Sequence, residues 1–241
     1  MQNPDDGMAQ RTQRLPQCEA RGVRKRCQRG DGGDDANREL SAEDLVTAED
    51  VVVTLSQRGY IKRQPLATYR QQHRGGKGVI GMTTREEDAV ETLQVANTHD
   101  WAMFFTNRGR AFSTKVHEIP DASRQNKGIP IINLPGVQVD SGEVPVATVI
   151  LQHFNAGTYL AFSTKKGIIK KTAIEQFEKV RSSGIIAITL DKGDELSQVI
   201  PTSGEDDLVL ATRQGRICRF HEKEVRAMGL TAGGVIGIRL A

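Results

Sequence analysis

Ser56-Gln57-Arg58-Gly59 lies between two short apolar runs. It consists of one hydroxyl residue, two polar residues and a glycine, and this pattern recurs three times later in the chain. The later copies are Thr106-Asn107-Arg108-Gly109, Thr164-Lys165-Lys166-Gly167 and Thr212-Arg213-Gln214-Gly215. Each copy follows a β-branched or aromatic run, which is typical of a hairpin whose turn holds glycine at positive φ. The pattern predicts four hairpins, with returning strands at residues 60–63, 110–113, 168–171 and 216–220.

A second glycine follows each turn glycine at a nearly constant distance. These glycines are Gly78, Gly128, Gly184 and Gly234, which lie 19, 19, 17 and 19 residues after the first. Each opens another apolar run, at residues 79–82, 129–132, 185–188 and 235–238. Repeats of about 50 residues built from short strands are typical of radial or solenoid β architectures. The sequence therefore predicts an all-β fold, a propeller-like array of four repeats or blades.

The blades are predicted at residues 47–100, 101–155, 156–205 and 206–241. Their apolar runs are short, rich in Val and Ile and bounded by Gly, Pro and Asn, which favours strands over helices. Only residues 171–180 and 221–228 have a weak helical pattern. The last repeat stops directly after its second apolar run, so we expect an incomplete blade with an exposed strand edge. Either a longer protein or a truncated reading frame would explain this.

Residues 1–38 differ from the repeats. They are rich in Gln, Arg, Asp and Gly, match no repeat and are expected to be a disordered leader before the domain at 39–241. Within the leader, residues 21–29 (RGVRKRCQR) form a basic run. Such a run is compatible with nucleic-acid contact, although a solvated tail is the commoner interpretation.

The charge of the chain is unevenly divided. Residues 1–50 hold 8 basic and 11 acidic side chains, and the remaining residues hold 25 basic and 19 acidic ones, a balance of 25 − 19 = +6. Because this excess is modest, nucleic-acid binding must depend on clustering of the cations. No apolar run is long enough for a membrane span or a signal peptide, so we expect no membrane partner and a cytoplasmic protein.

Catalytic, metal and cofactor sites are not predicted. Cys18, Cys27 and Cys218 have no CxxC spacing, and the five histidines have no paired ligand spacing. The run Gly75-Gly76-Lys77-Gly78 is not a Walker A motif, because that motif needs Ser or Thr after the lysine.

The candidate binding motif is Gln72-His73-Arg74-Gly75-Gly76-Lys77-Gly78. Between Gln57 and Gly78 the chain has six Lys or Arg and no Asp or Glu. Because glycine has no Cβ, this heptad would let a polyanion approach the backbone closely while the cations neutralise its phosphates. A mobile, solvated loop is the alternative interpretation.

Cations also recur in register at the hairpins, where equivalent positions in a radial array would lie around one rim. A curved cationic stripe of this kind would bend a duplex, offsetting an elastic cost of about 1–6 kcal/mol for a bend of about 40–90°. The alternative is that Lys and Arg are merely frequent on exposed strands. The predicted rim residues are Arg58, Lys62, Arg63, Arg108, Arg110, Lys165, Lys166, Lys170, Lys171, Arg213, Arg216 and Arg219.

These motifs resemble a known family. Residues 39–241 are similar to the C-terminal domain of the gyrase A protein of DNA gyrase, a type IIA topoisomerase. Residues 50–55 (DVVVTL) and 59–63 (GYIKR) resemble the first strands of that domain, and residues 40–45 (LSAEDL) its acidic lead-in. The heptad resembles the family's GyrA-box, QRRGGKG, and departs from it only at His73, where the family usually has Arg.

The resemblance implies a β-pinwheel that wraps double-stranded DNA on its basic rim and supports negative supercoiling. It also implies two partners in the intact enzyme, the gyrase A cleavage domain and the gyrase B protein. The family domain usually has more blades than the four visible here, and the cleavage domain with its catalytic tyrosine is missing, so this chain alone is not expected to cleave DNA. Two alternatives stay open: the topoisomerase IV counterpart, which binds DNA without strong wrapping, and a propeller-like protein-interaction scaffold.

Overall fold

The computed structural model describes residues 45–69, 71–78, 80–82, 88–140, 142–155, 157–180 and 183–240. The predicted leader at 1–38, with its basic run, lies outside these residues. All of the described residues belong to one unit, Leu40–Ala241. In this part of the chain, no helix is long and apolar enough to cross a membrane.

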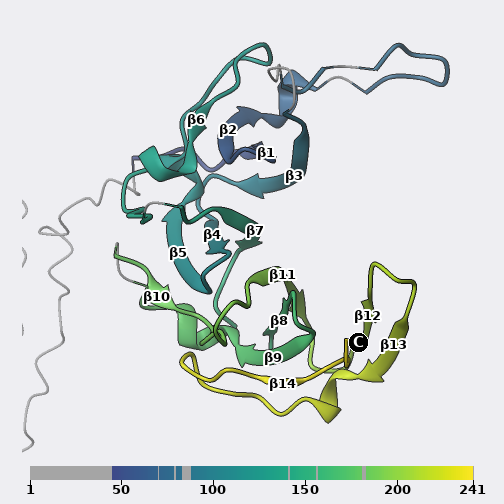
Figure 1. Cartoon of the computed structure of the whole chain (residues 1–241). Coiled ribbons are helices and arrows are strands. Elements are labelled where there is room, and N and C mark those ends of the chain that lie inside the picture. The colour runs from purple at the N-terminus through teal and green to yellow at the C-terminus, as the bar shows by residue number, and fades with distance from the viewer. Residues whose placement is uncertain are drawn as a thin grey trace, which may run out of the picture. The chain divides into compact units, whose positions relative to one another are not determined.

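The four predicted hairpins are present (Figure 1). They are β1 (Asp50–Ser56) with β2 (Tyr60–Pro65), β4 (Trp101–Thr106) with β5 (Arg110–Lys115), β8 (Tyr159–Thr164) with β9 (Ile168–Ala173), and β12 (Asp207–Ala211) with β13 (Ile217–His221). Their turn glycines, Gly59, Gly109, Gly167 and Gly215, have φ values of 78°, 77°, 82° and 78°. Only glycine adopts such values without strain, so the all-β repeat prediction is confirmed.

Each of the first three hairpins gains a third strand from its own repeat. These strands are β3 (Val90–Asn97) on β1, β7 (Pro145–Leu151) on β4 and β11 (Leu196–Thr202) on β8, all antiparallel.

The fourth strand of each sheet comes from the following repeat. β6 (Ile129–Pro130) pairs with β2, β10 (Ile185–Ile186) with β5 and β14 (Val235–Ile236) with β9. Each of these two-residue strands begins directly after one of the second glycines. Three of the four second apolar runs thus form two-residue strands, and each of these strands completes the sheet of the preceding repeat, whereas residues 80–82 of the first run are not in a strand. We call these three strands docked strands, and they link the sheets into one array.

The two segments with a weak helical pattern form only short 3₁₀ turns, at Ile174–Phe177 and Glu222–Glu224. Similar turns stand at Leu66–Thr68, Val116–Glu118 and Ile131–Asn133. These pieces connect strands and do not build a helical layer.

The core lies between neighbouring sheets. On β4, Phe104 packs into a cluster with residues of the first sheet, whereas Phe105 packs into a cluster with residues of the third. Successive side chains of a strand point to opposite faces, so β4 is apolar from residue 101 to residue 105 because both of its faces are covered. Phe105 meets Phe162 edge-on, with ring centroids 5.5 Å apart. Burying each of these rings stabilises the fold by about 1.5–3 kcal/mol.

The fourth hairpin is different. β12 and β13 form a two-stranded sheet, and no further strand of the described residues pairs with it. Its smaller core cluster consists of Ala161 and Ile169 from the third sheet with Leu208 and Val225.

Candidate nucleic-acid interface

The heptad at residues 72–78 builds a closed loop from its own hydrogen bonds. The amide of Gly76 donates to the carbonyl of His73 over 3.0 Å, which forms a turn with Gly75 at a φ of 88°. The side chain of Gln72 closes the base, because its Oε1 accepts from the amide of Gly78 at 2.9 Å and its Nε2 donates to the carbonyl of Gly78 at 3.4 Å. Gln72 therefore has a structural role, because its side chain joins the two ends of the loop that carries the basic residues.

This loop presents its charges to solvent. All seven residues are exposed, and the segment extends outward from the first sheet (Figure 1). A Cβ built on Gly75 or Gly78 would meet no atom within 4 Å, so both glycines leave the backbone open to a large ligand. Arg74 directly precedes Gly75 and Lys77 directly precedes Gly78, so each cation lies next to an open glycine, an arrangement that suits the phosphates of a polyanion.

Five of the predicted rim cations lie on the tips of the hairpin turns and are exposed. They are Arg58, Arg108, Lys165, Lys166 and Arg213. Aspartates from nearby loops hold two of the tips by their backbone: the amide of Arg58 donates to Asp88, and that of Lys166 to Asp194. The ammonium of Lys166 also donates to the carbonyl of Lys192 at 2.7 Å, so that both the backbone and the side chain hold this tip.

Three predicted rim lysines are instead buried, which corrects the sequence prediction for them. Lys62 is fully buried, and its ammonium donates to the carbonyls of residues 123, 124 and 126 at 2.9, 3.0 and 2.8 Å. Lys170 donates to the carbonyls of Ala187 at 2.6 Å and Leu230 at 2.7 Å. Lys171 donates to the carbonyl of Glu222 at 2.8 Å. These side chains cannot line an exposed rim, because burial of a charge requires the partners they already have.

Burial also changes the acidity of these groups. Desolvation lowers the pKa of Lys170 from 10.5 to about 8 and lowers that of Lys62 as well. The carbonyl partners explain how the charged form is tolerated at neutral pH.

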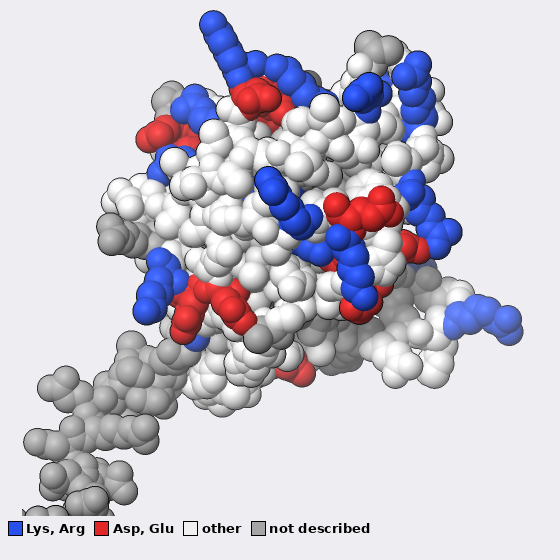
Figure 2. All heavy atoms as spheres, turned by 90° about the horizontal axis from the view of Figure 1, so that it is seen from below, with Lys and Arg blue, Asp and Glu red and all other residues white. Residues whose placement is uncertain are grey.

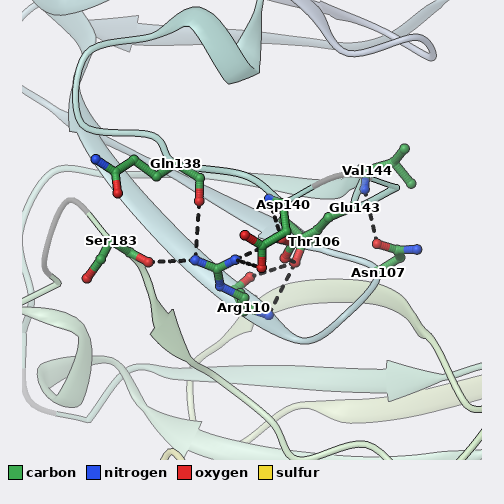
Figure 3. A network of polar contacts seen from close by, with 8 residues as sticks. All are labelled: Thr106, Asn107, Arg110, Gln138, Asp140, Glu143, Val144 and Ser183. Carbon is green, nitrogen blue, oxygen red and sulfur yellow. Dashed lines mark hydrogen bonds and ion pairs between the residues drawn. The ribbon is translucent and has the colours of Figure 1, made fainter.

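Arg110 is at the centre of a local network (Figure 3). Its Nη1 lies 2.9 Å from carboxylate oxygens of both Asp140 and Glu143, and its Nη2 donates to the carbonyls of Gln138 and Ser183. Glu143 is buried and also accepts from the hydroxyl of Thr106. With its guanidinium occupied in this way, Arg110 stabilises the second hairpin and is a weak candidate for a phosphate contact.

Two exposed rim cations have carboxylate neighbours. Lys165 pairs with Glu195 at 2.6 Å, and Arg219 pairs with Asp207. The hydrogen bond from Arg219 lowers the pKa of the Asp207 carboxyl below its usual value. On the face drawn in Figure 2, Lys and Arg side chains project both at the margin and near the middle, and acidic groups lie beside several of them. Pairs this exposed are worth little to stability.

The remaining members of the predicted rim differ in exposure. Arg216 is exposed beside the fourth turn, and Arg63 is half-buried on β2. Sequence reasoning missed two cations on the loop that Lys62 holds: Arg124, which is exposed, and Lys127, whose ammonium lies 4.4 Å from the centroid of the Tyr60 ring. They lie four residues and one residue before Gly128, the same positions that Arg74 and Lys77 hold before Gly78, so the repeat pattern could have identified them.

Three antiparallel sheets, each completed by a strand of the next repeat, define a β-pinwheel, a propeller-like class of domain. The family described as "DNA gyrase C-terminal domain, beta-propeller" matches residues 50–97, 100–138, 158–203 and 206–241. Because these segments make up well over half of the sequence, the chain belongs to the DNA gyrase C-terminal domain family.

Curated relatives agree with this assignment. The gyrase A protein of Halalkalibacterium halodurans is 46% identical over 196 residues, and that of Escherichia coli K12 is 46% identical over 202 residues. These matches cover 81% and 84% of this chain but only 23% of each relative. The chain thus spans about a quarter of the length of the relatives it matches.

Solved structures show the same fold. The C-terminal domain of DNA topoisomerase IV superposes with a TM-score of 0.69 at 31% identity, covering 81% of this chain and 59% of that one. A DNA gyrase A C-terminal domain gives a TM-score of 0.63 at 23% identity, covering 80% of this chain and 61% of that one.

Proposed function

We propose that this chain binds duplex DNA without sequence specificity and wraps it, as the C-terminal domain of a gyrase A protein. The observation that carries the proposal is the exposed heptad loop, which is closed by Gln72 and offers Arg74 and Lys77 beside open glycine backbone. The family assignment agrees with this function.

The hairpin tips would extend the DNA path beyond the heptad. Each described hairpin turn carries at least one exposed cation, and phosphates bind such cations in a sequence-independent way. The buried lysines take no part in binding. Arg124 joins the proposed surface, because it is an exposed cation close to the first sheet.

Wrapping can be measured through DNA topology. Nicked plasmid is ligated in the presence of increasing amounts of the protein, then deproteinised and resolved by gel electrophoresis. We expect a shift in linking number that grows in proportion to bound protein. DNA binding with an unchanged linking number would contradict wrapping and would favour the behaviour expected of the topoisomerase IV counterpart, whose solved domain superposes well on this fold.

A salt series tests the DNA interface itself. If cations displace counterions from phosphates, the logarithm of the binding constant falls linearly with the logarithm of the salt concentration, by about 0.9 per phosphate neutralised. No measurable DNA binding at low salt would contradict the proposal and would favour a protein-interaction scaffold.

The proposed partners in the cell follow from the family. In an intact gyrase, the chain would act beside the gyrase A cleavage domain and the gyrase B protein, and those parts would supply strand cleavage. The likeness to bacterial gyrase A proteins would place this activity in the cytoplasm. Pull-down of gyrase B by the chain joined to a cleavage domain, but not by the chain alone, would support this division of roles.

A further inference from the structure

One turn recurs before the second glycine of the repeats. Its backbone hydrogen bond ends at a carbonyl that lies five residues before that glycine. The bonds run from Gly76 to His73 at 3.0 Å, from Asn126 to Ser123 at 3.0 Å and from Ala232 to Gly229 at 3.2 Å. The copy in the third repeat includes residues 181 and 182, which lie outside the described part of the chain. The heptad loop is therefore one copy of a turn that the repeats share.

Two of the repeats carry a pair of cations around this turn. The two positions lie four residues and one residue before the second glycine. They hold Arg74 and Lys77 in the first repeat and Arg124 and Lys127 in the second, but Val180 and Ser183 in the third and Leu230 and Gly233 in the fourth. Residues 122–128 contain no Asp or Glu, although Asp121 precedes them. The second repeat therefore places the same pair of cations as the heptad on the same turn.

The backbone of the second loop has its carbonyls directed inward. The buried ammonium of Lys62 binds the carbonyls of residues 123, 124 and 126. In a trans peptide the C=O and N–H groups point in opposite directions, so the amides of Arg124, Gln125 and Lys127 point away from Lys62. None of these three amides has a hydrogen-bond acceptor among the described residues. Because residues 123–126 are exposed, the amides are available to an anion from solvent.

The loop is also held by bonds of its own and by the first sheet. The amide of Gly128 donates to Oδ1 of Asn126 at 3.1 Å, and Nε2 of Gln64 on β2 donates to the carbonyl of Ala122 at 2.8 Å. Neither bond involves the side chain of Arg124. The loop thus has its shape before a ligand arrives, so little ordering entropy opposes binding.

We propose that residues 123–128 form a second phosphate-binding loop. A backbone phosphate of duplex DNA accepts hydrogen bonds from the outward amides and from the guanidinium of Arg124, as anions do in backbone nests. A hollow lined by Pro65, Thr68, Ser123 and Arg124 places the loop beside the segment that leads into the heptad. This inference rests on the DNA binding proposed above and assigns a further contact to it.

Binding of a short duplex to the full chain tests the loop. A duplex of about 20 base pairs, far below the persistence length of about 150 base pairs, reports contacts without wrapping. Fluorescence anisotropy at several salt concentrations gives the affinity and the salt slope. We expect Arg124→Ala to weaken binding and to lower the slope by about 0.9. The control Lys179→Ala removes an exposed cation from the corresponding loop of the third repeat and should leave the slope unchanged.

A second pair of variants tests the amides without removing a cation. Gln125→Glu places a carboxylate beside the outward amides and should weaken binding at low salt by at least about fivefold, because it repels a phosphate at short range. Gln176→Glu adds the same charge at an exposed position of the third repeat and should have a much smaller effect.

The heptad variant shows whether the two loops bind different phosphates. Adding Arg124→Ala to the protein with Arg74→Ala and Lys77→Ala should lower the slope by a further 0.9 or about that amount. No further fall would mean that both loops share one contact, and would overturn the claim of a second site.

The remaining outcomes separate this inference from the proposed function. Circular dichroism and thermal denaturation check that each variant is folded. If Arg124→Ala lowers the slope no more than Lys179→Ala does, the second loop is overturned while DNA binding by the chain stands. Equal effects of Gln125→Glu and Gln176→Glu would also overturn it. A wild-type chain that does not bind the duplex at low salt would overturn the proposed function and this inference together.

Discussion

The ammonium group of Lys62 on β2 lies 2.8 Å from the carbonyl oxygen of Asn126, a residue 64 positions later in the chain. Asn126 shortly precedes the glycine-led strand β6, which docks beside β2. A buried charge of the first repeat thus holds the loop that delivers the last strand of its own sheet. Lys170 has the same role in the third sheet, where it binds Leu230 ahead of β14.

Replacing Lys62 should therefore affect stability and not DNA contact. We expect Lys62→Met to lower the free energy of unfolding by roughly 2–4 kcal/mol, because buried carbonyls lose their charged donor. The matched control is Arg58→Met, which removes an exposed cation from the same hairpin. That change should leave stability within about 0.5 kcal/mol and reduce the salt slope of DNA binding by about 0.9. Denaturant titration measures the change in stability, and a binding series at several salt concentrations measures the salt slope. If Lys62→Met instead reduced the salt slope and left stability unchanged, Lys62 would be a DNA contact after all.

The buried ammonium of Lys170 should make stability depend on pH. Its pKa is lowered by burial from 10.5 to about 8, so between these values the unfolded chain holds a proton that the folded chain has released. The cost of the buried charge is fully present below about pH 8, and the free energy of unfolding rises as pH increases towards 10.5. Relative to Lys170→Met, the wild type should gain roughly 1–3 kcal/mol over this range. Denaturation curves of the two proteins from about pH 7.5 to about pH 10.5 provide the measurement, and parallel curves would argue against the shift.

The sequence could predict those parts of the fold that depend on a short repeated pattern, but not those that depend on contacts between distant residues. The four hairpin turns were readable because Gly59 and its counterparts occupy fixed positions in a short pattern. The pairing of β6 with β2 was not readable, because spacing along a chain does not say which edge a two-residue strand will join. For the same reason Lys62 and Arg58 looked equivalent in sequence, although one side chain is buried beneath a loop of the next repeat and the other is exposed.

Docking of β6 should make Gly128 the least replaceable of the positive-φ glycines in this sheet. A Cβ there would lie 2.2 Å from the carbonyl oxygen of Ile61, so alanine would displace the strand in addition to straining its own backbone. Gly215 is the matched control, since its φ of 78° is close to the 79° of Gly128 but its surroundings are open. We expect Gly215→Ala to cost about 1–2 kcal/mol from backbone strain alone. Gly128→Ala should cost at least twice as much, as measured by thermal or chemical denaturation of dilute protein. Equal costs would mean that the strand moves away without penalty.

Arg110 should be more important for the fold than for binding. Arg110→Met leaves the buried carboxylate of Glu143 without its cation, a situation that typically costs about 3–5 kcal/mol. The double change Arg110→Met with Glu143→Gln removes that uncompensated charge and should recover part of the loss. Denaturant unfolding of the two single variants and the double variant forms the cycle. Additive losses would show that the two side chains do not stabilise each other.

The heptad loop should contribute to DNA wrapping through position as well as charge. Arg74→Ala with Lys77→Ala removes two exposed cations but keeps the glycines and the hydrogen bond between Gln72 and Gly78 that closes the loop. We expect the salt slope of binding to fall by about 2 and the linking-number shift to be largely lost. The control, Arg24→Ala with Lys25→Ala, removes the same charge from the basic run near the N-terminus. If the loop cations bind DNA because of their position next to the open glycines, this control should keep most of the linking-number shift. Equal losses in the two double variants would mean that the loop supplies only generic charge.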